Sequence, residues 1–511
     1  MASSDRQSRH SRNWSQSTDE RQTLLIHNNT MDPIPVAAEN DAYEINKPLE
    51  LIGKDKDVLA SYVRKCDRRL LAYLCVGYGL DSINKMALSY AKVAGLTKDL
   101  GLSGTDISVA LGAYYLGSFF FQLPSNLMLK RTRPRWWLSA AMLAWSTATM
   151  CMALSKKPRD LAGLRFLFGA VQAGYLTGSL YYISYWYPRD LVRRRTGWFF
   201  ASSGVGGIIV GPLCSGLSAI HSPHIASWQL IFLVAGACSA LWSMLGPRVL
   251  QDFPDTATFI TDEERALVTR IMVRQNTVAS SQSVRLRQVV MAMADHKVWL
   301  WTIIDFCANG ATQVNGMFGP TIIASQGFSP VAAQAMTSLT NLMATAGMAS
   351  IAYVARLVGG SARALWISNA ITALGFILAL ASQSNATRMV ALFLFSFASP
   401  QPAAHAPAWM LANLQGNTKP AMAAAFSSAV GGLGPLATAF VYRDKDSPTF
   451  RLGHSVCLSM TVAAAIATLV LYVVLRRENA KRDRSPADIS DLTPEQVLDL
   501  ADNHPDFRYK L

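Results

Sequence analysis

Ionisable side chains lie inside long apolar stretches of this sequence. Asp81 is followed one helical turn later by Lys85, and Asn84 lies on the same face of the predicted helix. An acid and a base at this spacing can form an ion pair. A charged side chain at bilayer depth costs roughly 2.5–3.5 kcal/mol, so such residues usually face a cavity and find a partner. The pattern favours contact with a solute or a proton; a pair that only neutralises itself is the alternative.

A second polar stripe carries a cation. Its members follow one another at steps of seven, three, four and three residues: Arg165, Gln172, Tyr175, Ser179 and Tyr182. Arg165 could bind an anionic group through two parallel hydrogen bonds. It could equally extend to the membrane surface or hold its helix against a neighbour.

A third stripe carries a carboxylate. Asp305, Asn309, Thr312 and Gln313 share one face of a predicted helix, with Asp305 about two turns from one end. A carboxylate there could take up and release a proton, and a contact between two halves of the molecule is the alternative.

A fourth stretch combines prolines with a histidine. Pro400, Pro402 and Pro407 flank His405. Proline removes backbone donors and bends helices, so we expect a broken helix, which in transporters often marks a binding site. His405 titrates near physiological pH and is another candidate proton carrier, although a packing role is the alternative.

The elements that must position these residues are membrane helices. Hydrophobic residues make up 51% of the 511 residues and charged residues only 16%, against roughly 25% charged in soluble domains. A spanning helix needs about 20 mostly apolar residues. Twelve segments qualify, at about 70–91, 107–129, 136–155, 161–183, 197–219, 228–247, 299–323, 332–355, 364–382, 388–412, 421–441 and 454–475. We therefore predict an all-α membrane protein with twelve transmembrane helices in two six-helix bundles.

The breaks between the apolar segments define the domains. We predict a disordered amino-terminal tail (1–65), a first bundle (66–247), a central linker (248–298), a second bundle (299–475) and a carboxyl-terminal tail (476–511). Thr261 to Arg265 are typical of the cap and first turn of a soluble helix in the linker.

Loop charge predicts the orientation. Lys and Arg are more frequent in the loops on the side of the linker, which places that side and both termini in the cytosol. Clusters after the second and fourth helices are candidates for a cytosolic gate: Lys130, Arg131, Arg133, Arg193 and Arg194. Asn385 begins a glycosylation sequon in a predicted outer loop.

The helix plan and several local motifs resemble a known family. Two sets of six helices with a central linker resemble the major facilitator superfamily. Leu80–Asn84, Pro124–Arg131, Arg165–Gly169, Tyr185–Pro188 and Asn503–Leu511 are similar to elements of the fungal allantoate permease family, the anion:cation symporters. The resemblance covers about residue 65 to the end. It implies the major facilitator fold and proton-coupled uptake of small organic anions such as ureides, carboxylated vitamins or short peptides.

The sequence departs from that family at several positions. Ser82 replaces an Arg, while Gln172 and Ala235 replace Glu. The fifth predicted helix, at about 197–219, contains a partial form of the superfamily's antiporter element at Gly207–Gly216. These departures favour the alternative of a fungal exporter of a secondary metabolite. A third hypothesis is a non-transporting nutrient sensor, against which the short tails argue.

The remaining features exclude other classes. No phosphate-binding loop is present, and the seven cysteines have no metal-ligand or redox spacing. We therefore expect no enzyme activity, no cofactor, no metal and no nucleic-acid partner. We expect instead a monomeric multi-pass protein, in the plasma membrane, that carries a small solute with protons across the bilayer.

Overall fold

A computed structural model describes residues 54–220, 223–280, 290, 292–414, 418–484, 502, 505 and 507–511. The chain divides into a unit of residues 1–56 and a compact unit of residues 57–511. The first unit contributes only its last three residues to the described part. The regular elements of the second unit, among the residues described, are all helical.

The first half contains six spanning segments. They are α4 (Ala72–Ala91), α6 (Gly104–Arg131), α7 (Pro134–Met152), the pair α8 (Pro158–Gln172) and α9 (Tyr175–Trp186), α10 (Arg189–Ala219) and α11 (Ser227–Val249). One π-helical turn precedes α4 (η1, Asp67–Leu71) and one follows it (η2, Lys92–Leu96), and the short α5 (Thr97–Asp99) comes next. Ser103 begins α6 with a capping box, in which its hydroxyl accepts from the Asp106 N–H at 3.2 Å.

The second half repeats the plan. Its spans are α14 (His296–Ala324), α15 (Pro330–Leu357), α16 (Ser361–Ala381), the pair α17 (Asn385–Ala398) and α18 (Pro400–Ala412), the pair α19 (Thr418–Gly431) and α20 (Gly434–Ala439), and α21 (Arg451–Arg484). The predicted break among the prolines lies at Ser399, immediately before Pro400, where a backbone donor is missing.

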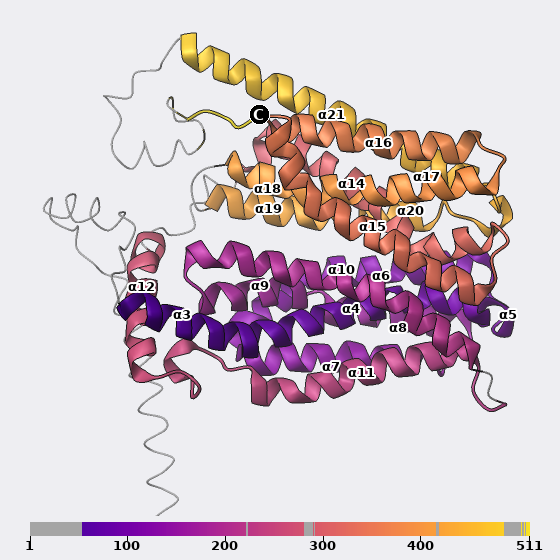
Figure 1. The fold of residues 1–511 in the computed structure, drawn as a ribbon, viewed down its shortest axis with the longest axis horizontal. Helices are drawn as coiled ribbons and strands as arrows, with labels where there is room; N and C mark the ends of the chain where they lie inside the picture. Colours follow the sequence, from indigo (N-terminus) through magenta and orange to yellow (C-terminus); the bar gives the residue numbers. More distant parts are fainter. Residues whose placement is uncertain are drawn as a thin grey trace, which may run out of the picture. The chain divides into compact units, whose positions relative to one another are not determined.

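Each predicted span therefore corresponds to one helix or to two consecutive helices, and the predicted fold class is confirmed. Five of the described segments are long and apolar enough to cross a membrane by composition alone: Arg194–Ala219, Ser227–Val249, Ser361–Ala381, Met422–Ala439 and Arg451–Arg484. The polar stripes lower the hydropathy of several others. Figure 1 shows the helices of the first half, indigo to magenta, packed on one another, and those of the second half, orange to yellow, packed likewise.

Small residues allow the helices of the first half to approach closely. A Cβ atom on Gly117 of α6 would lie 2.2 Å from the Phe166 carbonyl oxygen of α8, and one on Gly169 of α8 would lie 2.1 Å from the Tyr114 carbonyl oxygen of α6. The two backbones touch at these glycines, as is common between membrane helices. This crossing fixes α8, which carries Arg165, against α6.

The linker folds against the first half at one end of the bundle, which we call the linker side. It contains η3 (Pro254–Thr256) and α12 (Asp262–Ser280). The predicted helix start is confirmed, because the Thr261 hydroxyl accepts from the Glu264 N–H at 3.3 Å and the Glu264 carboxylate accepts from the Thr261 N–H at 2.9 Å.

The predicted tails differ from the structure at their inner ends. α3 (Lys54–Cys66) is helical inside the segment expected to be disordered. The Tyr62 hydroxyl donates to the Trp186 carbonyl at 2.9 Å, and Lys65 pairs with Glu264 at 2.8 Å. Leu59, Tyr62, Val63 and Cys66 recur at helical spacing, and the face that they form packs on the first half. The polar composition of the rest of the tail obscured this local signal. At the other end of the chain, residues 507–511 contact the second half.

Candidate functional site

A cavity of about 200 Å³ lies between the two halves. Residues of α4, α6, α8 and α10 line it from the first half, and residues of α14 line it from the second. Its walls combine two cations, three tyrosines, small polar groups and apolar side chains: Lys85, Arg165, Tyr78, Tyr114, Tyr115, Ser82, Ser89, Ser203, Gln313, Gly316, Met86, Leu111 and Met317. Charged and polar side chains outnumber the aliphatic ones in this lining, so the cavity is more polar than most small-molecule pockets and suits a polar solute.

The predicted pair of Asp81 and Lys85 forms at the edge of this cavity. Lys85 Nζ lies 2.7 Å from Asp81 Oδ2. Asp81 is 0% exposed, and its Oδ2 also accepts from Gln172 Nε2 at 3.2 Å. Its Oδ1 is buried without a hydrogen-bond partner. The carboxylate thus lies behind the cavity wall, while the ammonium reaches the cavity.

Arg165 supplies a second cation to the same wall. Its side chain is 1% exposed, and its guanidinium donates to the Lys85 carbonyl at 3.1 Å. Its Nε is buried and has no hydrogen-bond partner, and the guanidinium carbon lies 5.8 Å from the Phe168 ring centroid. None of the described carboxylates forms an ion pair with Arg165. With Asp81 paired to Lys85, the charge of Arg165 leaves the cavity net positive.

Three other candidates of the first half lie outside the cavity lining. Gln172 bridges Asp81 and the Tyr114 hydroxyl, which donates to Gln172 Oε1 at 3.1 Å. Asn84 faces α11 and donates to Ser239 Oγ at 2.6 Å. Tyr175 packs edge-on against Trp145, with 4.7 Å between ring centroids. Gln172 therefore orients the Asp81 carboxylate, whereas Asn84 and Tyr175 hold helices together.

In the second half, Gln313 lines the cavity and Asp305 does not. The Asp305 carboxylate is 5% exposed and accepts from Asn309 Nδ2 at 2.8 Å and from Ser427 Oγ at 3.4 Å. A Cβ atom on Gly431 would lie 2.4 Å from Asp305 Oδ2, so α19 packs directly on this carboxylate. Among the described residues, no cation pairs with Asp305.

His405 and the helix break lie near each other in sequence but differ in their contacts. His405 on α18 is partly buried, and its Nε2 is buried without a hydrogen-bond partner. The Ser399 carbonyl at the break accepts from Thr312 Oγ1 of α14 at 2.8 Å. The break is thus fixed by the helix that also carries Gln313, and His405 is not among the cavity-lining residues.

The end of the cavity opposite the linker side is closed by α10 and α15. Asn341 Nδ2 donates to the Gly207 carbonyl at 2.5 Å, and Ser338 Oγ donates to the Ile208 carbonyl at 2.7 Å. A Cβ atom on Gly211 would lie 2.6 Å from the Gln334 carbonyl oxygen, a backbone atom of α15, so a larger residue would push the two helices apart. Gly211 of the element at Gly207–Gly216 therefore allows this close contact between α10 and α15, whereas Gly216 has no neighbour within 4 Å.

The predicted gate is described only in part. Arg133 and Arg194 are exposed, and the Arg194 guanidinium carbon lies 4.9 Å from the Trp198 ring centroid. The side chains of Lys130, Arg131 and Arg193 lie outside the described residues. A neighbouring arginine, Arg195, instead forms two hydrogen bonds with Asp67 at 3.1 Å each.

Sequence reasoning missed the tyrosines and serines of the cavity. Tyr78, Ser82, Lys85 and Ser89 recur at steps of four, three and four residues and form one helix face. This face lies beside the predicted face of Asp81 and Asn84, so its polar spacing was visible in the sequence. Tyr114 and Tyr115 carry no charge and lie in an apolar run, which gives no comparable signal. The predicted glycosylation residue, Asn385, is exposed and donates to the Gln326 carbonyl at 3.0 Å.

Two helical halves around a polar cavity, joined by a linker, are the arrangement of secondary membrane transporters. Residues 74–440 match the family model described as Major Facilitator Superfamily, and the chain belongs to this family. The narrower resemblance to the allantoate permease family stays a prediction.

Relatives and solved structures agree with this assignment. The chain is 27% identical over 440 residues to an uncharacterized transporter of Schizosaccharomyces pombe, covering 85% of this chain and 86% of that protein. It is 23% identical to the major facilitator-type transporter hxnP of Emericella nidulans, covering 89% and 94%. A protein of Agrobacterium vitis whose name proposes tartrate transport is 25% identical, covering 82% and 96%.

The fold is similar to that of two transporters of known structure. The D-xylose-proton symporter superposes with a TM-score of 0.63 at 13% identity, covering 80% of this chain and 97% of that chain. An inward-facing bacterial homologue of the human lysosomal transporter Spinster superposes with a TM-score of 0.62 at 14% identity, covering 80% and 96%. At these identities the likeness concerns the fold alone.

Proposed function

We propose that this transporter carries a small organic anion, such as a carboxylate, ureide, carboxylated vitamin or short peptide. The observation that supports this most directly is the net positive cavity, where Arg165 has no acidic partner among the described residues. A guanidinium can bind a carboxylate through two parallel hydrogen bonds, and Lys85 offers a second charge beside it. The tyrosines and methionines of the wall would contact the less polar body of the solute.

Coupling to protons follows from the Asp81–Lys85 pair. An anion that draws Lys85 toward the cavity leaves Asp81 buried without its cation. A buried carboxylate that has lost its partner is strongly destabilised while it stays ionised, so Asp81 takes up a proton when the anion binds. Release of the anion restores the ion pair and expels the proton. Anion and proton then travel together, which is symport.

The orientation and location complete the proposal. The excess of Lys and Arg in the linker-side loops favours a cytosolic linker side with both termini in the cytosol. The α10–α15 contact then closes the outer end of the cavity. We propose a monomer in the plasma membrane that imports its solute.

An uptake screen tests the proposal. A panel of radiolabelled small carboxylates is presented to cells that lack related permeases and express either this chain or an empty vector, with and without a protonophore. We expect uptake of at least one carboxylate above the vector and its loss when the pH gradient collapses. Uptake that is indifferent to the protonophore would contradict the coupling.

Export of a metabolite is the second candidate, favoured by Gln172. An amide at this position donates to Asp81, where an acid would add a second proton site. Efflux from preloaded cells in the same strains separates the two directions. Faster efflux than in vector cells, without uptake of any panel member, would favour the exporter over the importer.

A further inference from the structure

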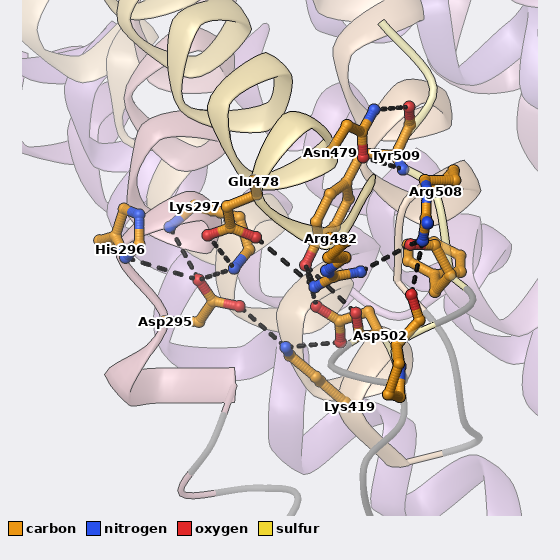
Figure 2. Close-up of polar contacts among 12 residues, drawn as sticks. Asp295, His296, Lys297, Lys419, Glu478, Asn479, Arg482, Asp502, Arg508 and Tyr509 are labelled. Carbon is orange, nitrogen blue, oxygen red and sulfur yellow. Dashed lines mark hydrogen bonds and ion pairs between the residues drawn. The ribbon is translucent and has the colours of Figure 1, made fainter. Parts of the chain in front are cut away.

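Seven side chains at the linker side of the second half form a closed ring, which we call the clasp ring. They come from the start of α14, the start of α19, the end of α21 and the described residues 502, 505 and 507–511, which we call the carboxyl-terminal segment: Asp295, Lys297, Lys419, Glu478, Arg482, Asp502 and Tyr509. Figure 2 shows these side chains converging, with dashed lines marking their contacts.

The buried part of the clasp ring is centred on Lys419. Its Nζ lies 2.8 Å from Asp295 Oδ2 and 2.6 Å from Asp502 Oδ1. Lys419 is 1% exposed and Asp502 is 0% exposed. Removing one member of such a buried pair leaves an uncompensated charge, which is far more costly than losing a surface pair. The ring therefore ties residue 502 firmly to α14 and α19.

Tyr509 and α21 close the ring. The Tyr509 hydroxyl donates to Asp502 Oδ2 at 3.1 Å and accepts from the Arg482 guanidinium at 3.2 Å. The remaining links join Arg482 to Glu478 at 3.6 Å, Glu478 to Lys297 at 3.4 Å and Lys297 to Asp295 at 3.3 Å. Lys297 and Arg482 also lie 5.3 and 4.7 Å from the Tyr509 ring centroid. One tyrosine thus holds both sides of the ring.

The main chain of the last residues adds further ties. The Lys510 carbonyl accepts from Trp409 Nε1 at 2.7 Å and from Asn413 Nδ2 at 3.0 Å, both on or just after α18. The Leu511 carbonyl accepts from the Ser361 N–H at the start of α16, at 2.9 Å. The carboxyl-terminal segment therefore contacts the linker-side ends of α16, α18 and α21 as well as residues of the ring.

The need for these ties arises from the interrupted helices. The span of α17 and α18 is interrupted at Ser399, and that of α19 and α20 at Gly432 and Leu433. Ser399 keeps helical torsion angles, but Pro400 and Pro402 lack backbone donors, so the joint to α18 is weaker than an uninterrupted helix. The short linker-side pieces, α18 and α19, therefore depend on contacts with their neighbours for their position. The ring and the segment fasten them to α14 and α21, which run unbroken through the bilayer.

We propose that the carboxyl-terminal segment is a working part of the transporter, in which Lys419 and Tyr509 are positioning residues. They hold α18 and α19 to α14 and α21, so that the linker-side ends of the second half move as one body. The clasp ring stays closed while the cavity opens alternately to the two sides.

Distances within the second half test the first claim. In a cysteine-free chain, spin labels at Leu411→Cys on α18 and Arg477→Cys on α21 are measured by double electron–electron resonance in nanodiscs. We expect one narrow distribution of the distance between the two labels. Tyr509→Phe, which removes only the hydroxyl, should broaden it by several ångströms, whereas Tyr472→Phe on α21 outside the ring should not. An unchanged distribution in Tyr509→Phe, with the protein eluting as a folded monomer, would overturn the proposal.

A disulfide lock tests the second claim. Asn413→Cys with Lys510→Cys fixes the segment to the end of α18. A third cysteine, Ser82→Cys in the cavity, reports opening toward the end that α10 and α15 close, through its labelling by a membrane-impermeant maleimide added from that side. Labelling within twofold of the reduced protein supports a ring that stays closed. Loss of labelling in the locked protein would show that the segment must detach, and would overturn the claim.

Discussion

The two walls of the cavity differ in charge. The first half contributes Lys85 and Arg165, with Asp81 directly behind them, whereas the second half contributes the neutral Gln313, Gly316 and Met317. A charged solute would therefore be held by one half, and the other half would complete the site without competing for the charge. The difference assigns recognition to the first half and closure to the second.

The two buried carboxylates differ in the same way. Asp81 is paired with a lysine that the cavity can reach, whereas Asp305 is held by an amide and a hydroxyl and lies away from the cavity. Only Asp81 can sense a bound anion directly, because that anion competes for Lys85. Asp305 does not respond to the binding of an anion unless the halves move. Its contacts with Asn309 and α19 favour a packing role.

The largest expected effect comes from removing the uncompensated cation. Arg165→Gln should weaken anion binding roughly 10–100-fold, because a hydrogen bond to a charged group contributes about 1.5–3 kcal/mol. Arg159→Gln, an exposed arginine at the start of the same helix, is the matched control and should bind like the unchanged chain. Binding affinities of purified proteins in nanodiscs measure this. Equal losses of anion affinity in both variants would contradict the assignment of charge recognition to the first-half wall.

The next effect concerns coupling. A symporter that moves one proton with one monovalent anion accumulates that anion up to about tenfold per unit of pH difference, since one pH unit corresponds to about 1.36 kcal/mol. Asp81→Asn should reduce the ratio of inside to outside anion concentration to about one, because the residue can no longer take up a proton. Asp305→Asn, the buried carboxylate of the other half, should keep the response. The reverse result would move the proton site to the second half.

A smaller effect is expected on the neutral wall. Gln313→Ala should reduce affinity by about twofold to tenfold, in line with a net contribution of 0.5–1.5 kcal/mol for a neutral hydrogen bond. Gln313→Glu places a negative charge opposite Arg165 and should weaken anion binding more than alanine does. Equilibrium binding of both variants checks the order. A glutamate variant that binds anions as tightly as the alanine variant would show that this wall does not face the charge.

The smallest effect is expected from pH on the clasp ring. Burial opposes the charged forms of Asp295 and Lys419, which both lie outside the predicted spans. Lys419 and Lys297 nevertheless hold the pKa of Asp295 below its ordinary value, and Asp502 and Asp295 hold the pKa of Lys419 above its ordinary value. The contribution of Asp295 to the folding stability is present above about pH 3.9 and is lost as pH falls through its lowered pKa. The Lys419 contribution is present below about pH 10.4 and is lost as pH rises through its raised pKa.

Between pH 5 and 8 the ring should therefore be unchanged. The distance between spin labels on α18 and α21 measures this directly. A shift within that range would mean that a pH-dependent transport rate cannot be assigned to the cavity alone.

Sequence reasoning reached the spans, the linker helix, the break at Ser399 and the pair of Asp81 and Lys85, because each has a local signal. It placed Asn84 with Asp81, but the helix is rotated so that Asn84 contacts α11. Rotation of a membrane helix depends on packing against its neighbours, which a single sequence does not fix.

The clasp ring shows a second limit. Its members are separated by up to about two hundred residues along the chain, and Asp502 and Tyr509 lie in a segment expected to be a tail. Only tertiary contacts reveal that their charges balance one another. The helix α3 is a different case, because Leu59, Tyr62, Val63 and Cys66 recur at helical spacing and its local signal was present in the sequence.

The central claim is that the first-half wall selects for negative charge. It is tested most directly by binding of a panel of small carboxylates to the purified chain, each measured beside its uncharged amide analogue. We predict that at least one carboxylate binds at least tenfold more tightly than its amide, and that Arg165→Gln removes the difference. Amides that bind as tightly as their carboxylates, with no response to Arg165→Gln, would contradict the account.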